Sequence, residues 1–183
     1  MAEAPQEWLR RIQAGEPAAA ERLMGEMFGP VRRYLEGMLR NPAQAEDLAQ
    51  EAMVRLVEHA SEFRGEASLR TYLFQIAHNL ALNHISAAPT KREEYGSEAP
   101  LSKEDGRSGA FETLALEEER RRVRLALGCL PPRQRSVVIL RAWEELSFKE
   151  IARVMGLAEG TAKAHYFFAL KNMRRAMEAE NGP

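Results

Sequence analysis

The sequence predicts an all-α protein of two small helical domains, an N-terminal helical bundle and a C-terminal helix-turn-helix, joined by a flexible linker. Three observations support this fold class. Apolar residues recur every three to four positions and do not alternate with polar ones over a strand's length. Proline, asparagine, serine and glycine stand where helices would begin or end. Between the two periodic blocks, residues 86–119 break the periodicity.

The composition limits the class of protein. The chain has 183 residues, of which 45% are hydrophobic, enough for one or two packed domains. No apolar run reaches the roughly 20 residues of a membrane-spanning helix, and the first residues do not resemble a signal peptide. Cys129 is the only cysteine, which excludes an intrachain disulfide and a CxxC metal site. We therefore expect a cytoplasmic protein.

The N-terminal domain is expected to span residues 1–86. Apolar residues from Trp8 to Ile12 suggest a short first helix, and Pro17 and Pro30 are expected to begin two more.

The next helix is expected to begin at Asn41-Pro42, with Gln44 placed to close a capping box. Its apolar stripe consists of Ala45, Leu48, Ala49, Ala52, Met53, Leu56, Val57 and Ala60. Its outer face carries Glu46, Asp47, Gln50, Glu51, Arg55 and Glu58. A break with a turn glycine, Gly65, follows. Ser68 is then placed to cap a helix that reaches about Ile85.

Residues 87–119 are predicted to form an acidic, flexible linker. Pro89, Pro100 and three glycines interrupt the pattern, and residues 86–119 carry nine acidic against four basic side chains. We expect a helix to resume near Glu112.

The C-terminal domain, residues 120–183, carries the helix-turn-helix pattern. Pro131-Pro132 opens a helix, and the segment from Ser147 to Glu150 reads as the capping box of the next. Gly156 is expected to end that helix in the left-handed conformation. Ala152 and Gly156 are small enough for two helices to cross closely, which would set the following helix into a major groove about 12 Å wide. That helix is expected to turn Ala162, Tyr166, Ala169, Leu170, Met173 and Met177 towards the interior.

The distribution of charge also favours the C-terminal domain as the part that binds DNA. Residues 120–183 carry 13 basic and 6 acidic side chains, whereas residues 1–85 carry 9 and 12. Clustered Lys and Arg are typical of a phosphate-binding surface, although an ordinary solvated helical surface gives the same count.

The outward face of the last helix is the candidate DNA-reading surface. Lys163 and Lys171 are placed to pair with phosphates, and Thr161 and His165 to reach base edges. The face is completed by Ala164, Phe167 and Phe168. An aromatic edge suits a thymine methyl, but one of the two phenylalanines is equally suited to packing against another helix, and His165 to a surface position without a role.

Several segments resemble the sigma factors of bacterial RNA polymerase, of the sigma-70 family and its extracytoplasmic-function (ECF) group. The segments 130–135, 146–152 and 160–163 resemble the promoter-binding C-terminal region of that family. The segments 45–51 and 63–79 resemble its N-terminal region. Both occur in the family's order and together with the linker cover about 140 residues.

The resemblance implies a partner for the outer face of the helix that begins at Pro42. In such proteins this helix docks on the clamp helices of the largest subunit of core RNA polymerase, and the flap is a second contact. The residues that would dock are Asp47, Gln50, Glu51 and Arg55. A row of acids and an amide suits an arginine-rich partner, although a plain solvated helix face would look the same.

The resemblance also implies two DNA contacts. The segment around 63–83 would read and open the −10 element and hold a flipped base of the non-template strand, which costs a few kcal/mol. Its residues would be Arg64, Ser68, Arg70, His78, Asn79 and Asn83. The −35 element would be read by Arg141 together with Thr161, Lys163, Ala164, His165, Phe167, Phe168 and Lys171.

The chain departs from the family at several positions. Ala158 stands where a polar helix cap is usual, which should cost about 1 kcal/mol unless Glu159 compensates. His165 and Phe168 stand where arginines are common, and the usual basic cluster after His84 is absent. These departures imply weaker anchoring of phosphates at both elements.

Other function classes lack their own patterns. A response regulator would need an α/β domain before the DNA reader, and a nuclease would need metal ligands, but the four histidines are scattered. A purely structural adaptor gives no reason for the basic C-terminal half. We therefore expect a sigma factor without catalytic residues, cofactor or metal, controlled by an anti-sigma factor, as the family implies.

Overall fold

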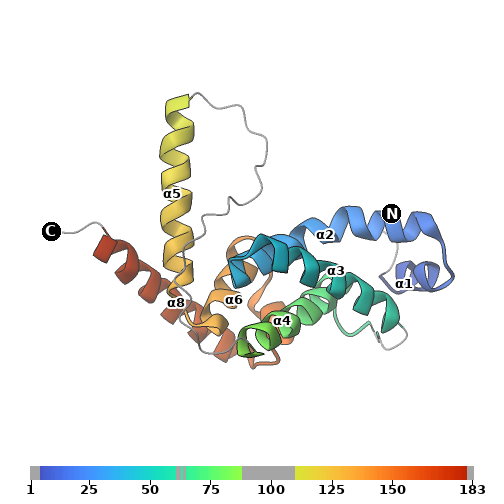
Figure 1. The fold of residues 1–183 in the computed structure, drawn as a ribbon. Helices are drawn as coiled ribbons and strands as arrows, with labels where there is room; N and C mark the ends of the chain where they lie inside the picture. The colour runs from blue at the N-terminus through green and yellow to red at the C-terminus, as the bar shows by residue number, and fades with distance from the viewer. Residues whose placement is uncertain (1–4, 61–62, 64, 88–109, 181–183) are drawn as a thin grey trace.

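A computed structural model describes residues 5–60, 63, 65–87 and 110–180. Within these ranges it contains eight helices and no strand, so the predicted all-α class is confirmed (Figure 1). We call α1–α4 the N-terminal half and α5–α8 the C-terminal half. The helices are α1 Pro5–Gln13, α2 Pro17–Leu39, α3 Pro42–Glu58, α4 Leu69–Ala87, α5 Ala110–Gly128, α6 Pro132–Ala142, α7 Phe148–Met155 and α8 Glu159–Glu180.

The expected caps of α3 and α4 are present. The Asn41 side chain accepts a hydrogen bond from the backbone N–H of Gln44 at 3.2 Å, and Ser68 Oγ accepts one from the N–H of Thr71 at 3.1 Å. The capping box expected at Gln44 is not formed, because its Oε1 lies 3.0 Å from Nε2 of His84 on α4. That bond joins the start of α3 to the end of α4.

The expectation that Pro30 begins a helix is wrong, because Pro30 lies inside α2. A proline within a helix removes one hydrogen bond and costs about 3 kcal/mol. Val31, Tyr34 and Leu35 directly follow it and are completely buried. Each buried side chain of this size contributes about 1.5–3 kcal/mol, so their burial offsets the cost of continuing the helix through the proline.

Only the two ends of the expected linker are described, and Ala87 is the last residue of α4. Residues 88–109 lie outside the described ranges, and residues 110–119 belong to α5, which begins two residues before Glu112. α5 projects from the rest of the molecule, and its C-terminal end meets α8 (Figure 1).

The helix-turn-helix is formed by α7 and α8. The Ser147–Glu150 capping box is complete, and Gly156 ends α7 with a φ of +63°. The role expected for Gly156 in a close helix crossing is wrong, because a Cβ built there would meet no atom within 4 Å. Gly156 is therefore required by the left-handed turn alone.

The two halves pack on one another, which the sequence analysis did not predict. Helix α2 contacts α6 and α4 contacts α7, so that the buried apolar residues form one continuous cluster. The two halves approach closely at Gly37 of α2, where a Cβ would lie 2.7 Å from Ile139 Cδ1 and 2.9 Å from Trp143 Cζ3. None of the helices described is long and apolar enough to cross a membrane.

Candidate nucleic-acid interface

The predicted reading face of α8 is open to solvent. Thr161, Lys163, Ala164 and Lys171 are exposed, and His165 is half-buried. The Lys163 ammonium lies 2.7 Å from Glu159 Oε1, and this pair holds the pKa of the Glu159 carboxyl below its usual value. Glu159 stands in the first turn, where the helix dipole favours a negative charge, and so offsets the missing polar cap at Ala158.

The aromatic residues of this face do not pack against another helix. Phe167 is 66% and Phe168 52% exposed, and their rings meet each other edge to face at 5.7 Å. Leu170, expected on the inner side, is 46% exposed. Three large apolar side chains therefore lie on the outer surface of a basic helix.

Arg141 braces the turn before α7. Its Nη1 donates to the carbonyl oxygen of Leu146 at 3.0 Å, and its guanidinium lies 5.3 Å from the centroid of the Phe148 ring. The side chain is exposed, so the contacts that position it leave one side of the guanidinium in solvent.

The segment predicted for the −10 element is divided between surface and interior. Ser68, Asn79 and Asn83 are exposed, while Arg64 lies outside the described residues. Arg70 Nη2 donates to Glu144 Oε2 of the C-terminal half at 2.7 Å.

His78 does not lie at the surface, so its expected contact with backbone phosphates is not available in this structure. It is 2% exposed, and its Nδ1 lies 2.9 Å from the Tyr34 hydroxyl and 3.1 Å from Ser136 Oγ. The Tyr34 hydroxyl also lies 2.9 Å from Ser136 Oγ, which makes a closed polar cluster between α2, α4 and α6. Burial, and then the charge of Arg133, lower the pKa of His78 to about 4.

A second buried group between the halves is the carboxylate of Glu144, in the turn after α6. Its side chain is 0% exposed, and Arg33 Nε of α2 lies 4.0 Å from its Oε1. Burial raises the pKa of Glu144, while Arg70 and then Arg33 oppose that shift. Nothing in the sequence pattern identified this residue, because periodicity shows which face of a helix is buried but not which charged residue it meets.

Arg135 holds the segment 130–135 against the C-terminal ends of α2 and α5. The side chain is 6% exposed, and it donates to four carbonyl oxygens at the ends of α2 and α5 and in the turn after α5. These are Met38 at 2.7 Å, Leu127 and Gly128 at 3.0 Å and Leu130 at 3.1 Å. One guanidinium thus donates to C-terminal carbonyls of two helices and joins the two halves.

The predicted partner-docking face of α3 is exposed. Asp47, Gln50 and Arg55 are exposed, and Glu51 is half-buried with its Oε1 2.6 Å from Arg55 Nη2. Val54, which the sequence analysis did not single out, is 55% exposed in the same row. The face therefore combines acids with an apolar centre.

Two family models match the chain in consecutive segments. Residues 23–89 match sigma-70 region 2, and residues 120–173 match sigma-70 region 4. The chain is 26% identical over 183 residues to the RNA polymerase sigma-H factor of Pseudomonas aeruginosa, covering 96% of this chain and 95% of that protein. It is 30% identical to the ECF RNA polymerase sigma factor BldN of Streptomyces coelicolor, covering 93% of this chain and 65% of that longer protein.

The chain belongs to the ECF group of the sigma-70 family. A solved structure of the sigma factor RpoE in complex with the anti-sigma factor NepR from Bartonella quintana has the same fold, with a TM-score of 0.67 and 18% identity, over 86% of this chain and 96% of that one. As a sigma factor, the chain acts in promoter-specific initiation of transcription.

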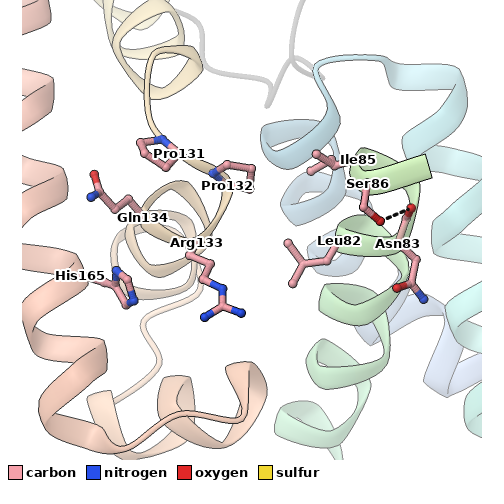
Figure 2. Close-up of a pocket in the computed structure, with 9 residues that line it drawn as sticks. All are labelled: Leu82, Asn83, Ile85, Ser86, Pro131, Pro132, Arg133, Gln134 and His165. Carbon is pink, nitrogen blue, oxygen red and sulfur yellow. Dashed lines mark hydrogen bonds between the residues drawn. The ribbon is translucent and has the colours of Figure 1, made fainter. Parts of the chain in front are cut away.

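In this sigma factor the two matched regions meet along one cleft. Region 2 contains α3, α4 and most of α2, and region 4 contains α6, α7 and the greater part of α8. The cleft has a volume of about 530 Å³, and it is lined by Leu82, Asn83, Ile85 and Ser86 of α4, Pro131, Pro132, Arg133 and Gln134 at the start of α6, and His165 of α8. Figure 2 shows Leu82 and Arg133 facing one another across it. Asn83 and His165, predicted for two separate promoter elements, therefore line the same small space.

Among the described residues of the sigma factor there is no group of three or more His, Cys, Asp or Glu side chains that could hold a metal ion. The described residues predicted to contact DNA or polymerase include arginines, lysines, amides and aromatic rings, most of them at the surface.

Proposed function

We propose that this chain binds core RNA polymerase and directs it to promoters by recognising −35 and −10 elements and helping to open the duplex. It acts by binding and positioning, with no catalytic residue of its own. The observation that carries the proposal is the exposed face of α8, the second helix of a helix-turn-helix whose first helix, α7, is capped at both ends.

The −35 contact is assigned to that face. Lys163 and Lys171 anchor phosphates, whereas Thr161 and half-buried His165 reach the bases. The exposed rings of Phe167 and Phe168 suit the apolar methyl groups of thymine in a major groove. Arg141, braced by Leu146 and Phe148, stands at the edge of the same unit.

The −10 contact is assigned to α4 and the loop before it. Asn79 and Asn83 offer exposed amide donors and acceptors for an unstacked base, and Ser68, Arg64 and Arg70 are assigned to the same strand. Unstacking a base costs a few kcal/mol, and the hydrogen bonds and stacking contacts made to the unstacked base must offset that cost.

The core-polymerase contact is assigned to the outer face of α3. The carboxylates of Asp47 and Glu51, with Gln50 and Arg55, flank the exposed Val54. Charged and amide groups around an apolar centre are suited to an arginine-rich coiled coil.

The two halves must separate for both elements to be read at once. The −10 and −35 elements lie about 25 base pairs apart, or about 85 Å along the duplex. Asn83 and His165 line one cleft in the structure, so no straight promoter can reach both of them. The packed arrangement is therefore a form that precedes promoter binding.

An anti-sigma factor is the proposed inhibitor and the cytoplasm the proposed location. The similar sigma factor RpoE was solved together with an anti-sigma factor. A protein that stabilises the packed arrangement would keep the halves from separating.

Run-off transcription with core polymerase on promoter fragments from the host genome tests the proposal. We expect specific transcripts with the wild-type chain. Asp47→Ala combined with Glu51→Ala should weaken binding to core polymerase by about tenfold or more, since each charge-assisted contact contributes about 1.5–3 kcal/mol. Glu21→Ala, an exposed acid on α2, is the control and should transcribe normally. If the chain does not bind core polymerase, or if it supports no transcript on any fragment, the proposal is contradicted.

A further inference from the structure

The carboxylate of Glu144 makes the packing of the two halves depend on neighbouring arginines. Glu144 belongs to the C-terminal half, yet both cations next to it belong to the N-terminal half. Arg70 of α4 donates to its Oε2 at 2.7 Å, and Arg33 of α2 lies at 4.0 Å from its Oε1. The Glu144 side chain is 0% exposed, whereas Arg70 is 41% exposed.

The environment of Glu144 disfavours an uncompensated charge. Its Oε1 has no hydrogen-bond partner among the residues that the structure describes, and burial raises its pKa. A buried carboxylate is stable only while its cations remain in place, and removing the hydrogen-bonded Arg70 leaves a charge that water does not reach and that Arg33 at 4.0 Å offsets only in part. Replacing the carboxylate by a neutral group, by contrast, removes that penalty. The packed arrangement therefore needs Arg70 because Glu144 is charged.

Arg70 has a second possible partner of the same charge. It stands in the segment assigned to the −10 strand, and its guanidinium is accessible from solvent. A DNA phosphate and the Glu144 carboxylate offer the same paired oxygen acceptors, so one guanidinium cannot fully satisfy both. A ligand that binds only one of two conformations shifts the equilibrium towards that conformation.

We propose that Glu144 competes with DNA for Arg70 and makes the packed arrangement depend on that arginine, so that a DNA phosphate that takes Arg70 away separates the two halves. Loss of Arg70 to the strand then leaves Glu144 buried without its hydrogen-bonded cation, with only Arg33 at 4.0 Å, and the halves separate to return the carboxylate to water. The DNA step rests on the proposed function, but the dependence of packing on the Glu144–Arg70 pair does not.

The test measures the distance between the halves with spin labels by double electron–electron resonance. One label is placed on the exposed native Cys129 and the other on Glu21→Cys of α2. The full chain is compared with Arg70→Gln, Glu144→Gln and the double variant. Arg153→Gln is the matched control, because Arg153 also crosses between the halves but donates to the carbonyl of Glu66, where no buried charge is left behind.

We expect one short distance in the parent chain, in Glu144→Gln and in Arg153→Gln. Arg70→Gln should raise the ratio of separated to packed molecules by about tenfold or more. Adding Glu144→Gln to Arg70→Gln should restore the short distance. A packed Arg70→Gln variant, or separation that the second change does not reverse, overturns the proposal.

A second arm adds a single-stranded oligonucleotide to the parent chain and to Glu144→Gln. It changes nothing at Arg70, so it decides the proposal even if Arg70→Gln does not fold. Separation in the parent chain but not in Glu144→Gln supports the competition, and equal separation in both overturns it. If the variants behave as expected without DNA but the oligonucleotide binds neither protein, the pair is supported as the switch and the −10 role of Arg70 fails.

Discussion

The two segments assigned to DNA differ in what occupies their polar side chains. On α8, Lys163, Phe167 and Phe168 lie at the surface, and the partner of Lys163 is a neighbour one turn away. On α4, His78 is enclosed with Tyr34 and Ser136, and Arg70 is bonded to Glu144. Residues assigned to DNA therefore lie on an open surface in one half and in the interface between the halves in the other.

This difference shows that a residue's place in a DNA-binding segment does not fix its state in the free chain. The α4 side chains meet the C-terminal half because α2 and α4 pack against α6 and α7. The free chain in this arrangement exposes the α8 surface proposed for the −35 element, but it keeps His78 buried and Arg70 bonded to Glu144 in the segment proposed for the −10 element. Changes confined to one of the two surfaces should therefore have separable effects.

Acid should lower the stability that the buried His78 of α4 contributes, and it should leave the α8 surface unchanged. The pKa of His78 is about 4 when packed and about 6.5 when exposed, so the packed state excludes the proton. Its contribution is complete above pH 6.5 and is lost as the pH falls towards 4, to a total of about 3 kcal/mol. Urea unfolding at pH 7 and pH 4.5 measures this loss.

His78→Gln, which does not titrate, is the reference for that measurement. Glu36 and Glu144, whose pKa values are raised by burial, act with the opposite sign, and they do so in both proteins. The difference between the two proteins therefore isolates His78. An equal acid response in both would show that His78 is not enclosed.

Gly37→Ala should disturb the contact between α2 and α6. The added methyl would lie within 3 Å of Ile139 and Trp143, and overpacking of this kind costs about 1–3 kcal/mol. Gly25→Ala on the same helix is the control, since its Cβ would meet nothing within 4 Å and should stabilise the helix by about 0.5–1 kcal/mol. Thermal unfolding of both variants compares the two effects, and equal melting temperatures would contradict the packing of α2 on α6.

Lys163→Gln should affect only the α8 surface. Loss of one phosphate contact should weaken duplex binding and lower its salt dependence by about one ion, without changing the distance between the halves. Glu159→Gln frees Lys163 from its partner and should strengthen duplex binding. Fluorescence anisotropy at several salt concentrations gives both values, and an unchanged salt slope in Lys163→Gln would remove this residue from the DNA contact.

Phe167→Ala should have the smallest effect on folding. An exposed side chain contributes within about 0.5 kcal/mol to stability, so the melting temperature should hardly change while duplex binding falls. Phe168→Ala provides the comparison, and it shows which ring contributes more to duplex affinity. A large loss of stability in either variant would mean that the ring packs against the protein.

Sequence reasoning succeeded where the cause is local. The Asn41, Ser68 and Ser147 caps and the turn at Gly156 depend on a few neighbouring residues. The prediction that a helix begins at Pro30 is wrong, because the burial of Val31 and Tyr34 in the core outweighs the helix-breaking tendency of the proline. Sequence reasoning also missed Glu144, and it placed His78 at the surface, because nothing in one sequence shows which faces of two helical domains meet.

The distance between the spin-labelled positions 21 and 129, measured in the free chain and in complex with core polymerase, tests the account most directly. We expect one short distance in the free chain and a clearly longer one in the complex, because the two regions must reach promoter elements about 85 Å apart. An unchanged short distance in a complex that initiates transcription would contradict the account.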